Sequence, residues 1–241
     1  MSIVEQVIIQ FKEEGNFQEG ALVLVDKPLK WTSFDAVNKI RWCLKRTCGK
    51  IKVGHAGTLD PLATGLVIVC TGKWTKQIET FMGQEKEYVA SVCFGGTTPS
   101  YDLESEVDTT YPYEHVSREL LEKTLKEKFT GTIQQIPPKF SAVRVDGERA
   151  YKMARKGAEP DMPAREVFIR ELEILRFEPP VAELRIVCSK GTYIRSLAND
   201  IGKACDSGAY LAGLRRTAIG GFRVEQANKM EDLVAYLQDK S

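Results

Sequence analysis

The pattern of apolar and polar positions predicts a chain in which strands and helices alternate irregularly. Apolar positions three or four apart predict helices between Thr32 and Gly49, and at 73–82, 117–129, 148–156, 192–205 and 230–237. Short apolar runs predict strands at 21–25, 65–71, 87–94, 140–145, 166–177, 181–189 and 212–224. The prolines between 177 and 181 predict a tight turn, so the flanking strands should be antiparallel. This mixture predicts an α+β fold with a largely antiparallel sheet flanked by helices.

Hydroxyl side chains mark where several of these helices begin. Thr32 or Ser33 can cap the first helix, Ser117 can cap the helix at 117–129, and Thr192 can cap the helix that follows it. Gly49 is expected to end the first helix. The segment 54–61 then forms a loop between ordered elements.

Composition is that of an ordinary globular protein and excludes a membrane-spanning chain. The 241 residues are 43% hydrophobic and 28% charged, and no apolar run approaches the roughly 20 residues that cross a bilayer. The N-terminus lacks the pattern of a secretory signal, so we expect a cytoplasmic protein. The cysteines form no CxxC pair and the chain has 2 histidines, which predicts reduced thiols and no metal site.

The net charge of +1 conceals a segregation of charge along the chain. Residues 36–59 contain basic side chains and no acid. In residues 102–122 the charged side chains are acidic, with Arg118 as the exception. One cationic surface could therefore bind nucleic acid, although two solvated faces of opposite sign explain the same pattern.

The segment 54–61 concentrates residues with special backbone or chemical roles. Glycines, a proline, a histidine and one carboxylate, Asp60, stand close together there. Loops of this kind often hold active sites. The segment has no GxxxxGK[ST] or GxGxxG pattern, which argues against nucleotide binding. An aspartate before a proline is, on general statistics, most often a turn or cap residue.

The sequence GHAGTLDPLATGLV closely resembles the signature loop of the TruB family of tRNA pseudouridine synthases. Further segments resemble the family in the same order, over residues 22–224: LVLVDKPLKWTS, KEYVASVCFGGTTPSYDLES, QQIPPKFSAVRVDGERAYKMARKG, CSKGTYIRSLANDIG and LRRTAIGGF. The resemblance implies the pseudouridine synthase fold with an insertion, as one catalytic domain over 1–241 with a core of about 20–225. Only the short tail 226–241 follows, so no complete C-terminal PUA domain is expected.

The resemblance implies that the protein isomerises uridine at position 55 in the T arm of tRNA. Asp60 is then the nucleophile, Arg195 pairs with it, and Tyr88 packs against the flipped uracil, with Tyr88 or water removing the proton from the base carbon. A guanidinium would keep the carboxylate ionised and oriented. Attack on the sugar and addition to the base both remain open. The reaction involves no redox change or external energy, so no cofactor or metal is expected.

The remaining predicted site residues contact the substrate. The base must be flipped out of the RNA, and His55 is placed near it, whereas Lys27 with Pro28 is expected to shape the wall of the site without a catalytic role. The other predicted contacts are Gly57, Thr58, Leu59, Tyr193, Arg144, Lys152 and Arg215, with Arg216 and the basic residues of 39–52 on phosphates.

The expected partner is tRNA, bound through its T arm, without guide RNA or membrane, by a monomer. A tRNA-folding chaperone role could accompany catalysis, and a non-catalytic RNA-binding protein is the alternative of another class. A metal-dependent nuclease is disfavoured because the loop offers one carboxylate, Asp60.

Overall fold

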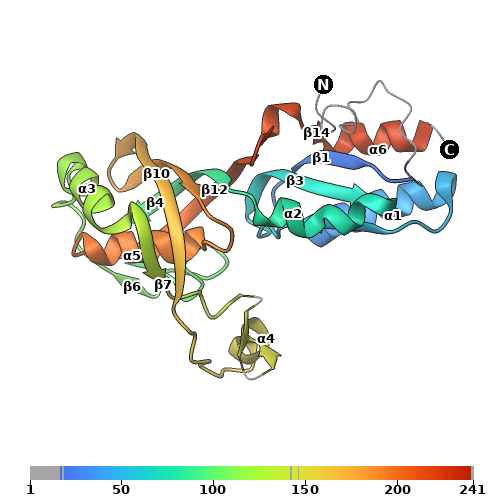
Figure 1. Ribbon diagram of the computed structural model, residues 1–241. Coiled ribbons are helices and arrows are strands. Elements are labelled where there is room, and N and C mark those ends of the chain that lie inside the picture. Colours follow the sequence, from blue (N-terminus) through green and yellow to red (C-terminus); the bar gives the residue numbers. More distant parts are fainter. Residues whose placement is uncertain (1–16, 18, 142, 146, 240–241) are drawn as a thin grey trace. The chain divides into compact units, whose positions relative to one another are not determined.

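The computed structural model describes residue 17 and residues 19–141, 143–145 and 147–239 (Figure 1). The N-terminal segment on which the signal-peptide prediction rests lies outside these residues. The chain divides into two compact units, which are described separately. Unit 1 comprises residues 1–87 and 215–241, and unit 2 comprises residues 88–214.

Unit 1 combines a mixed sheet with helices. Strand β1 pairs antiparallel with β3 and parallel with β14, β2 pairs with β3, and β13 pairs with the last part of β12. The strands are β1 (Leu22–Lys27), β2 (Val53–Ala56), β3 (Ala63–Thr71), β12 (Ala209–Ile219), β13 (Phe222–Arg223) and β14 (Asn228–Lys229). The helical elements are α1 (Ser33–Cys48), η1 (Gly72–Gln77), α2 (Ile78–Gly83), η3 (Val224–Gln226) and α6 (Met230–Asp239).

The core of unit 1 follows from strand alternation. Leu66, Ile68 and Cys70 of β3 pack with Leu22 and Leu24 of β1 against Phe81 of α2. The alternate valines of β1 and β3 point to the opposite face and are also buried. Helix α6 packs against both α1 and β1. Helical elements therefore cover this sheet, and the 57–62 loop joins its strands β2 and β3.

Unit 2 contains a sheet in which β10 pairs antiparallel with β11 and with β7. Its strand order is β12-β4-β11-β10-β7, where the first part of β12 and most of β4 belong to this unit. The strands are β4 (Lys86–Phe94), β7 (Gly131–Gln135), β10 (Arg165–Glu178) and β11 (Val181–Cys188), with the short hairpins β5 (Gly96–Thr97) with β6 (Thr109–Thr110) and β8 (Arg144–Val145) with β9 (Glu148–Arg149). The helices are α3 (Arg118–Thr124), the π-helical turn η2 (Leu125–Phe129), α4 (Ala150–Arg155) and α5 (Ile194–Ala204).

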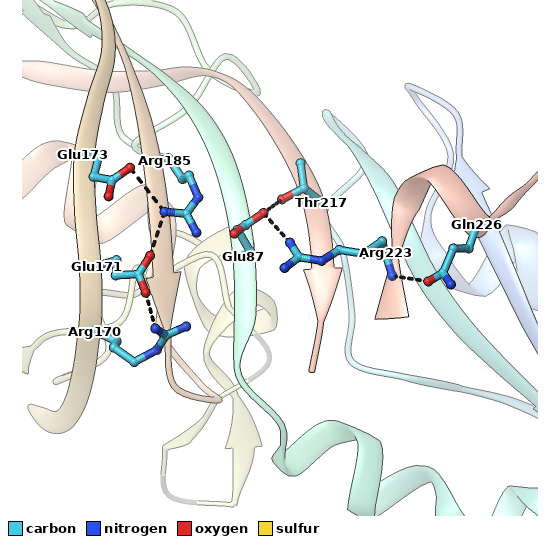
Figure 2. Close-up of polar contacts among 8 residues, drawn as sticks. All are labelled: Glu87, Arg170, Glu171, Glu173, Arg185, Thr217, Arg223 and Gln226. Carbon is cyan, nitrogen blue, oxygen red and sulfur yellow. Dashed lines mark hydrogen bonds and ion pairs between the residues drawn. The ribbon is translucent and has the colours of Figure 1, made fainter. Parts of the chain in front are cut away.

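Each unit contains a partly buried network of polar side chains (Figure 2). In unit 2, Arg185 of β11 contacts Glu171 at 2.7 Å and Glu173 at 3.2 Å, both on β10. In unit 1, Glu87 accepts hydrogen bonds from Thr217 at 2.8 Å and Arg223 at 3.0 Å.

Most predicted elements are confirmed, including the α+β class and the antiparallel pairing of β10 with β11. Helix α1 has the predicted cap at Thr32, completed as a capping box by Asp35, and Gly49 follows it with φ of 70°. Ser117 caps α3 as predicted.

Four local predictions are wrong. Of the predicted strand 140–145, only Arg144–Val145 are paired as a strand among the described residues, in a short hairpin with β9. Residues 53–56 form β2 because they pair with β3, so the loop that contains Asp60 is shorter than predicted. The predicted strand 212–224 is a hairpin, because Gly220 adopts a φ of 53° that turns the chain. Thr192 does not cap α5: Tyr193 occupies the N-cap position, and the Thr192 hydroxyl donates to the Ser189 carbonyl at 3.0 Å.

Candidate active site

Asp60 lies in a short loop between two paired strands of unit 1. The loop leaves β2 at Gly57, which has a φ of 88°, and enters β3 at Ala63. The backbone N–H of Ala63 donates to the Asp60 carbonyl at 3.1 Å. The Asp60 side chain is half-buried, so its carboxylate is held in a defined backbone frame while remaining accessible.

Ser33, the first residue of α1, fastens this loop to the helix. Its buried hydroxyl accepts from the Leu59 N–H at 2.8 Å and donates to the Leu59 carbonyl at 3.1 Å. The Lys30 N–H also donates to the Pro61 carbonyl at 2.8 Å. The residues on both sides of Asp60 are therefore tied to the start of α1.

The Ser33→Ala variant should lose stability because it leaves the buried N–H and carbonyl of Leu59 without their shared partner. We expect a decrease of about 1–3 kcal/mol in the free energy of unfolding, measured by urea denaturation. Ser91→Ala, which removes a half-buried hydroxyl of unit 2 that forms no hydrogen bond with the described residues, is the control. Equal stability of Ser33→Ala and wild type would contradict this anchoring role.

Arg216 of β12 supports the loop from the other side. It is 1% exposed and donates to three carbonyls: Nε to Leu66 at 2.7 Å, Nη2 to Gly57 at 3.2 Å and Nη1 to Thr58 at 3.5 Å. A Cβ at Gly65 would lie 2.3 Å from the Arg216 carbonyl oxygen, which explains the glycine. The prediction that Arg216 binds RNA phosphates is wrong, because its guanidinium is buried and hydrogen-bonded to carbonyls inside unit 1.

Lys27 of β1 is buried beside the same loop. It pairs across the sheet with Gly65, and its Nζ donates to the carbonyls of Trp31 at 2.5 Å and Pro28 at 3.0 Å. Burial lowers the pKa of Lys27 to about 8, the negative charge of Asp60 opposes this change, and Arg216 adds to it. Lys27 therefore lies beside the loop as a buried ammonium group that interacts electrostatically with Asp60.

The lowered pKa of Lys27 predicts a pH-dependent stability. Both states carry the charge below about pH 8, whereas between about 8 and 10.5 only the unfolded state keeps the proton, so stability rises with pH in that window. The free energy of unfolding of wild type minus that of Lys27→Met should rise by up to about 3 kcal/mol. Urea denaturation at several pH values measures this difference; a flat difference from pH 7 to 10.5 would contradict the lowered pKa.

His55 lies on β2, one strand position before the loop. Burial lowers its pKa below 6.5, the Arg216 charge lowers it further, and a backbone hydrogen bond with Gly57 opposes the change. The imidazole is therefore neutral at pH 7, a state that suits stacking or hydrogen bonding to a base. Of the neighbouring predicted contacts, Thr58 is exposed and Leu59 is 3% exposed.

Arg215 is adjacent to Arg216 in sequence but has a different environment. Its guanidinium forms a bidentate pair with Asp26, with nitrogen–oxygen distances of 2.8 and 3.0 Å, and lies 3.4 Å from the Thr64 hydroxyl. The side chain remains 41% exposed. Contact with RNA therefore stays a prediction for Arg215.

Tyr88 and Arg195 belong to unit 2, whereas Asp60 belongs to unit 1, so their predicted association stays a prediction. Tyr88 is 8% exposed on β4. Arg195 of α5 is buried, lies 3.6 Å from Asp102, and donates to the carbonyls of Ser100 at 3.3 Å and Phe140 at 3.2 Å. Asp102 was not selected from the sequence, although it stands in the segment TTPSYDLES that carried part of the family resemblance.

The other predicted contacts of unit 2 occupy two places. The backbone of Tyr193 exchanges two hydrogen bonds with the Gln135 amide, and Arg165 lies 4.4 Å from the centre of its ring. Arg144 and Lys152 line a hollow of about 730 Å³ beside the β8–β9 hairpin. Arg149 and Glu148 also line this hollow, and contact with RNA stays a prediction for Arg144 and Lys152.

The described residues contain no group of three or more histidine, cysteine or acidic side chains placed to hold a metal ion. Among them, Cys43, Cys70, Cys93, Cys188 and Cys205 are free thiols, as predicted. No helix in the described part of the chain is long and apolar enough to cross a membrane.

Comparison with known proteins identifies the class to which this fold and loop belong. Residues 45–194 match the model of the TruB family pseudouridylate synthase N-terminal domain, and residues 195–241 match the tRNA pseudouridylate synthase B C-terminal domain. These matches cover more than half of the chain, so the chain belongs to the TruB family of pseudouridylate synthases.

Particular relatives are similar over nearly their whole length. The tRNA pseudouridine synthase B of Phocaeicola vulgatus is 55% identical over 227 residues, which cover 93% of this chain and 96% of that protein. The protein of the same name from Bacteroides fragilis is 58% identical over 213 residues, covering 88% and 91%.

A solved structure shares the fold at lower identity. A chain in the crystal structure of a Cbf5–Nop10–Gar1 complex superposes with a TM-score of 0.69 at 29% identity. The similarity covers 93% of this chain and 60% of that chain, so this chain spans less than two thirds of that chain's length.

Proposed function

We propose that this protein isomerises uridine 55 in the T arm of tRNA to pseudouridine, with Asp60 as the nucleophile. The coarser activity, conversion of uridine to pseudouridine in tRNA, follows from membership of the TruB family and from the tRNA pseudouridine synthases that share more than half of its residues. The position in the tRNA and the role of Asp60 are the proposal.

The observation that carries the role of Asp60 is the rigid frame of its loop. Ser33 and Arg216 hold the residues on either side of the carboxylate, and the buried ammonium of Lys27 interacts with its negative charge. A carboxylate is an established type of covalent nucleophile in glycosyl chemistry. A fixed, half-buried carboxylate next to a cation suits attack on a flipped-out uridine by either route.

Neighbouring residues complete the proposed chemistry. Neutral His55 lies at the loop and contacts the RNA near the vacated base position. Arg195 pairs with Asp60 and keeps it ionised and oriented, while Tyr88 packs against the uracil and removes the proton from the base carbon, directly or through water. Both belong to unit 2, and the family resemblance supports these two roles.

The test incubates purified protein with an unmodified tRNA transcript in EDTA and maps pseudouridine by carbodiimide labelling and primer extension. One new stop in the T arm, lost when uridine 55 is replaced by cytidine, is the expected result. Modification at another uridine would discard the position but keep the reaction. A parallel incubation with Mg²⁺ in place of EDTA tests the alternative: cleavage of the tRNA that appears only with Mg²⁺ would favour the metal-dependent nuclease.

The proposal includes catalysis by the protein alone, as a monomer and without guide RNA. The same assay tests independence from guide RNA because it contains no other RNA or protein, and size-exclusion chromatography of the active protein tests whether it is a monomer. Tight binding of tRNA without a new stop would favour the tRNA-folding chaperone as the sole function. Isomerisation together with faster refolding of heat-denatured tRNA would show that both functions coexist.

A further inference from the structure

Four lysines of unit 1 surround one hollow that is separate from the Asp60 loop. The hollow measures about 520 Å³ and is lined by Lys50, Lys52, Lys73 and Lys76 together with Ile51, Gly72 and Thr75. No carboxylate lines it, and none of the four lysines forms an ion pair among the residues that the structure describes. We call these four residues the lysine pocket.

The strand register explains why the lysine pocket forms. Val53 at the start of β2 pairs with Thr71 at the end of β3, and the Gly72 N–H donates to the Lys52 carbonyl at 2.9 Å. This pairing joins the basic segment before β2 to η1, which follows β3. Two lysine pairs about twenty residues apart in sequence therefore share one surface, which the sequence pattern alone did not reveal.

Like charges gathered without a counter-charge repel one another, and an anion bound among them relieves that repulsion. A single surface lysine is usually only solvated. Four in one hollow, on a protein whose net charge is only +1, form a local field that a polyanion would complement. The phosphodiester backbone of RNA is such a polyanion.

An exposed aromatic side chain lies on the helix that leads to this pocket. Trp42 of α1 is 50% exposed, with the Nζ of Lys39 at 5.2 Å and the Cζ of Arg46 at 5.5 Å from its ring centre. Trp42 precedes the end of α1 by six residues, about 9 Å along the helix axis, and Lys50 follows that end. An aromatic ring between cations is the composition of nucleic-acid surfaces that combine stacking with phosphate contacts.

We propose that the lysine pocket and Trp42 form a second tRNA-binding surface, distinct from the residues around Asp60. The lysines bind phosphates, and the Trp42 ring packs against the base or ribose of an adjoining nucleotide. This inference rests on the proposed function, because it assigns part of the affinity for the same tRNA substrate. It predicts that the surface contributes to binding and not to the chemical step.

The test measures tRNA binding by filter retention at several salt concentrations. The double variant Lys73→Gln with Lys76→Gln should bind unmodified tRNA about tenfold more weakly, with a salt slope reduced by about 1.5, because two phosphate contacts are lost. The Trp42→Ala variant should bind tRNA at least about fivefold more weakly than wild type. The matched controls are Lys123→Gln with Lys126→Gln, which removes two exposed lysines of unit 2, and Phe168→Ala, which removes an aromatic side chain that is 45% exposed.

Single-turnover isomerisation at saturating protein should be the same in all these variants. If the double lysine variant and the Trp42→Ala variant both keep wild-type affinity and salt slope, the proposed second surface is wrong, while the proposed function stays intact. A wild-type protein that binds tRNA but makes no pseudouridine would overturn the proposed function, and the binding comparison would still decide whether the surface exists.

Discussion

The Asp60→Asn variant should lose isomerisation by at least about a thousandfold while binding tRNA within about threefold of wild type. Asparagine has nearly the same shape but carries no negative charge and is a very poor nucleophile. The reaction replaces the hydrogen on carbon 5 of uracil by a bond to the sugar, so tRNA labelled with tritium at that position releases tritium on turnover. Single-turnover tritium release measures the chemical step directly.

Asp35→Asn is the matched control for this substitution. Asp35 also lies close enough to Lys27 to influence its pKa, but it serves as the partner of Thr32 in the capping box of α1, accepting the Thr32 N–H at 2.9 Å. An asparagine oxygen can still accept that hydrogen bond, so activity should stay within about threefold. Near-normal tritium release by Asp60→Asn would remove Asp60 from the nucleophile role.

The elements that were predictable from the sequence are those specified by local chemistry. Helix α1 has an apolar face, a capping box at Thr32 and a glycine after its last residue, all within one continuous segment. Strands β10 and β11 are adjacent in sequence, so their antiparallel pairing needs only a short turn. The hairpin at Gly220 was missed because an apolar run on both sides of two glycines also fits one continuous strand.

The environment of the candidate site depended on long-range register, which the sequence does not show. Lys27 and Arg216 are far apart in the chain, yet Lys27 lies opposite Gly65 and Arg216 lies against it. Both cations are therefore buried behind the loop, whereas basic residues are generally exposed. Asp60 itself was identifiable as the candidate nucleophile because its neighbours in sequence carry the family motif.

The second large effect is expected for Arg216→Lys, which keeps the positive charge but removes the planar fork of donors. A lysine cannot reach the carbonyls of Gly57, Thr58 and Leu66 together, so at least two of these buried or partly buried acceptors lose their partner. The free energy of unfolding should fall by about 2–5 kcal/mol in urea denaturation. The control Arg223→Lys, on a side chain that is 54% exposed, should change it by less than about 0.5 kcal/mol.

If Asp60 is the nucleophile as proposed, Arg216 acts on the reaction through the loop that it holds and is a positioning residue, and this role has a kinetic signature. If the loop relaxes when its carbonyls are released, Asp60 is misplaced, and the maximal rate should fall about 10- to 100-fold with little change in KM for tRNA. A purely structural arginine would lower stability without changing the rate of the folded fraction. Measuring the rate well below the melting temperature separates these two cases, and an unchanged maximal rate would show that the Asp60 loop keeps its geometry without the guanidinium.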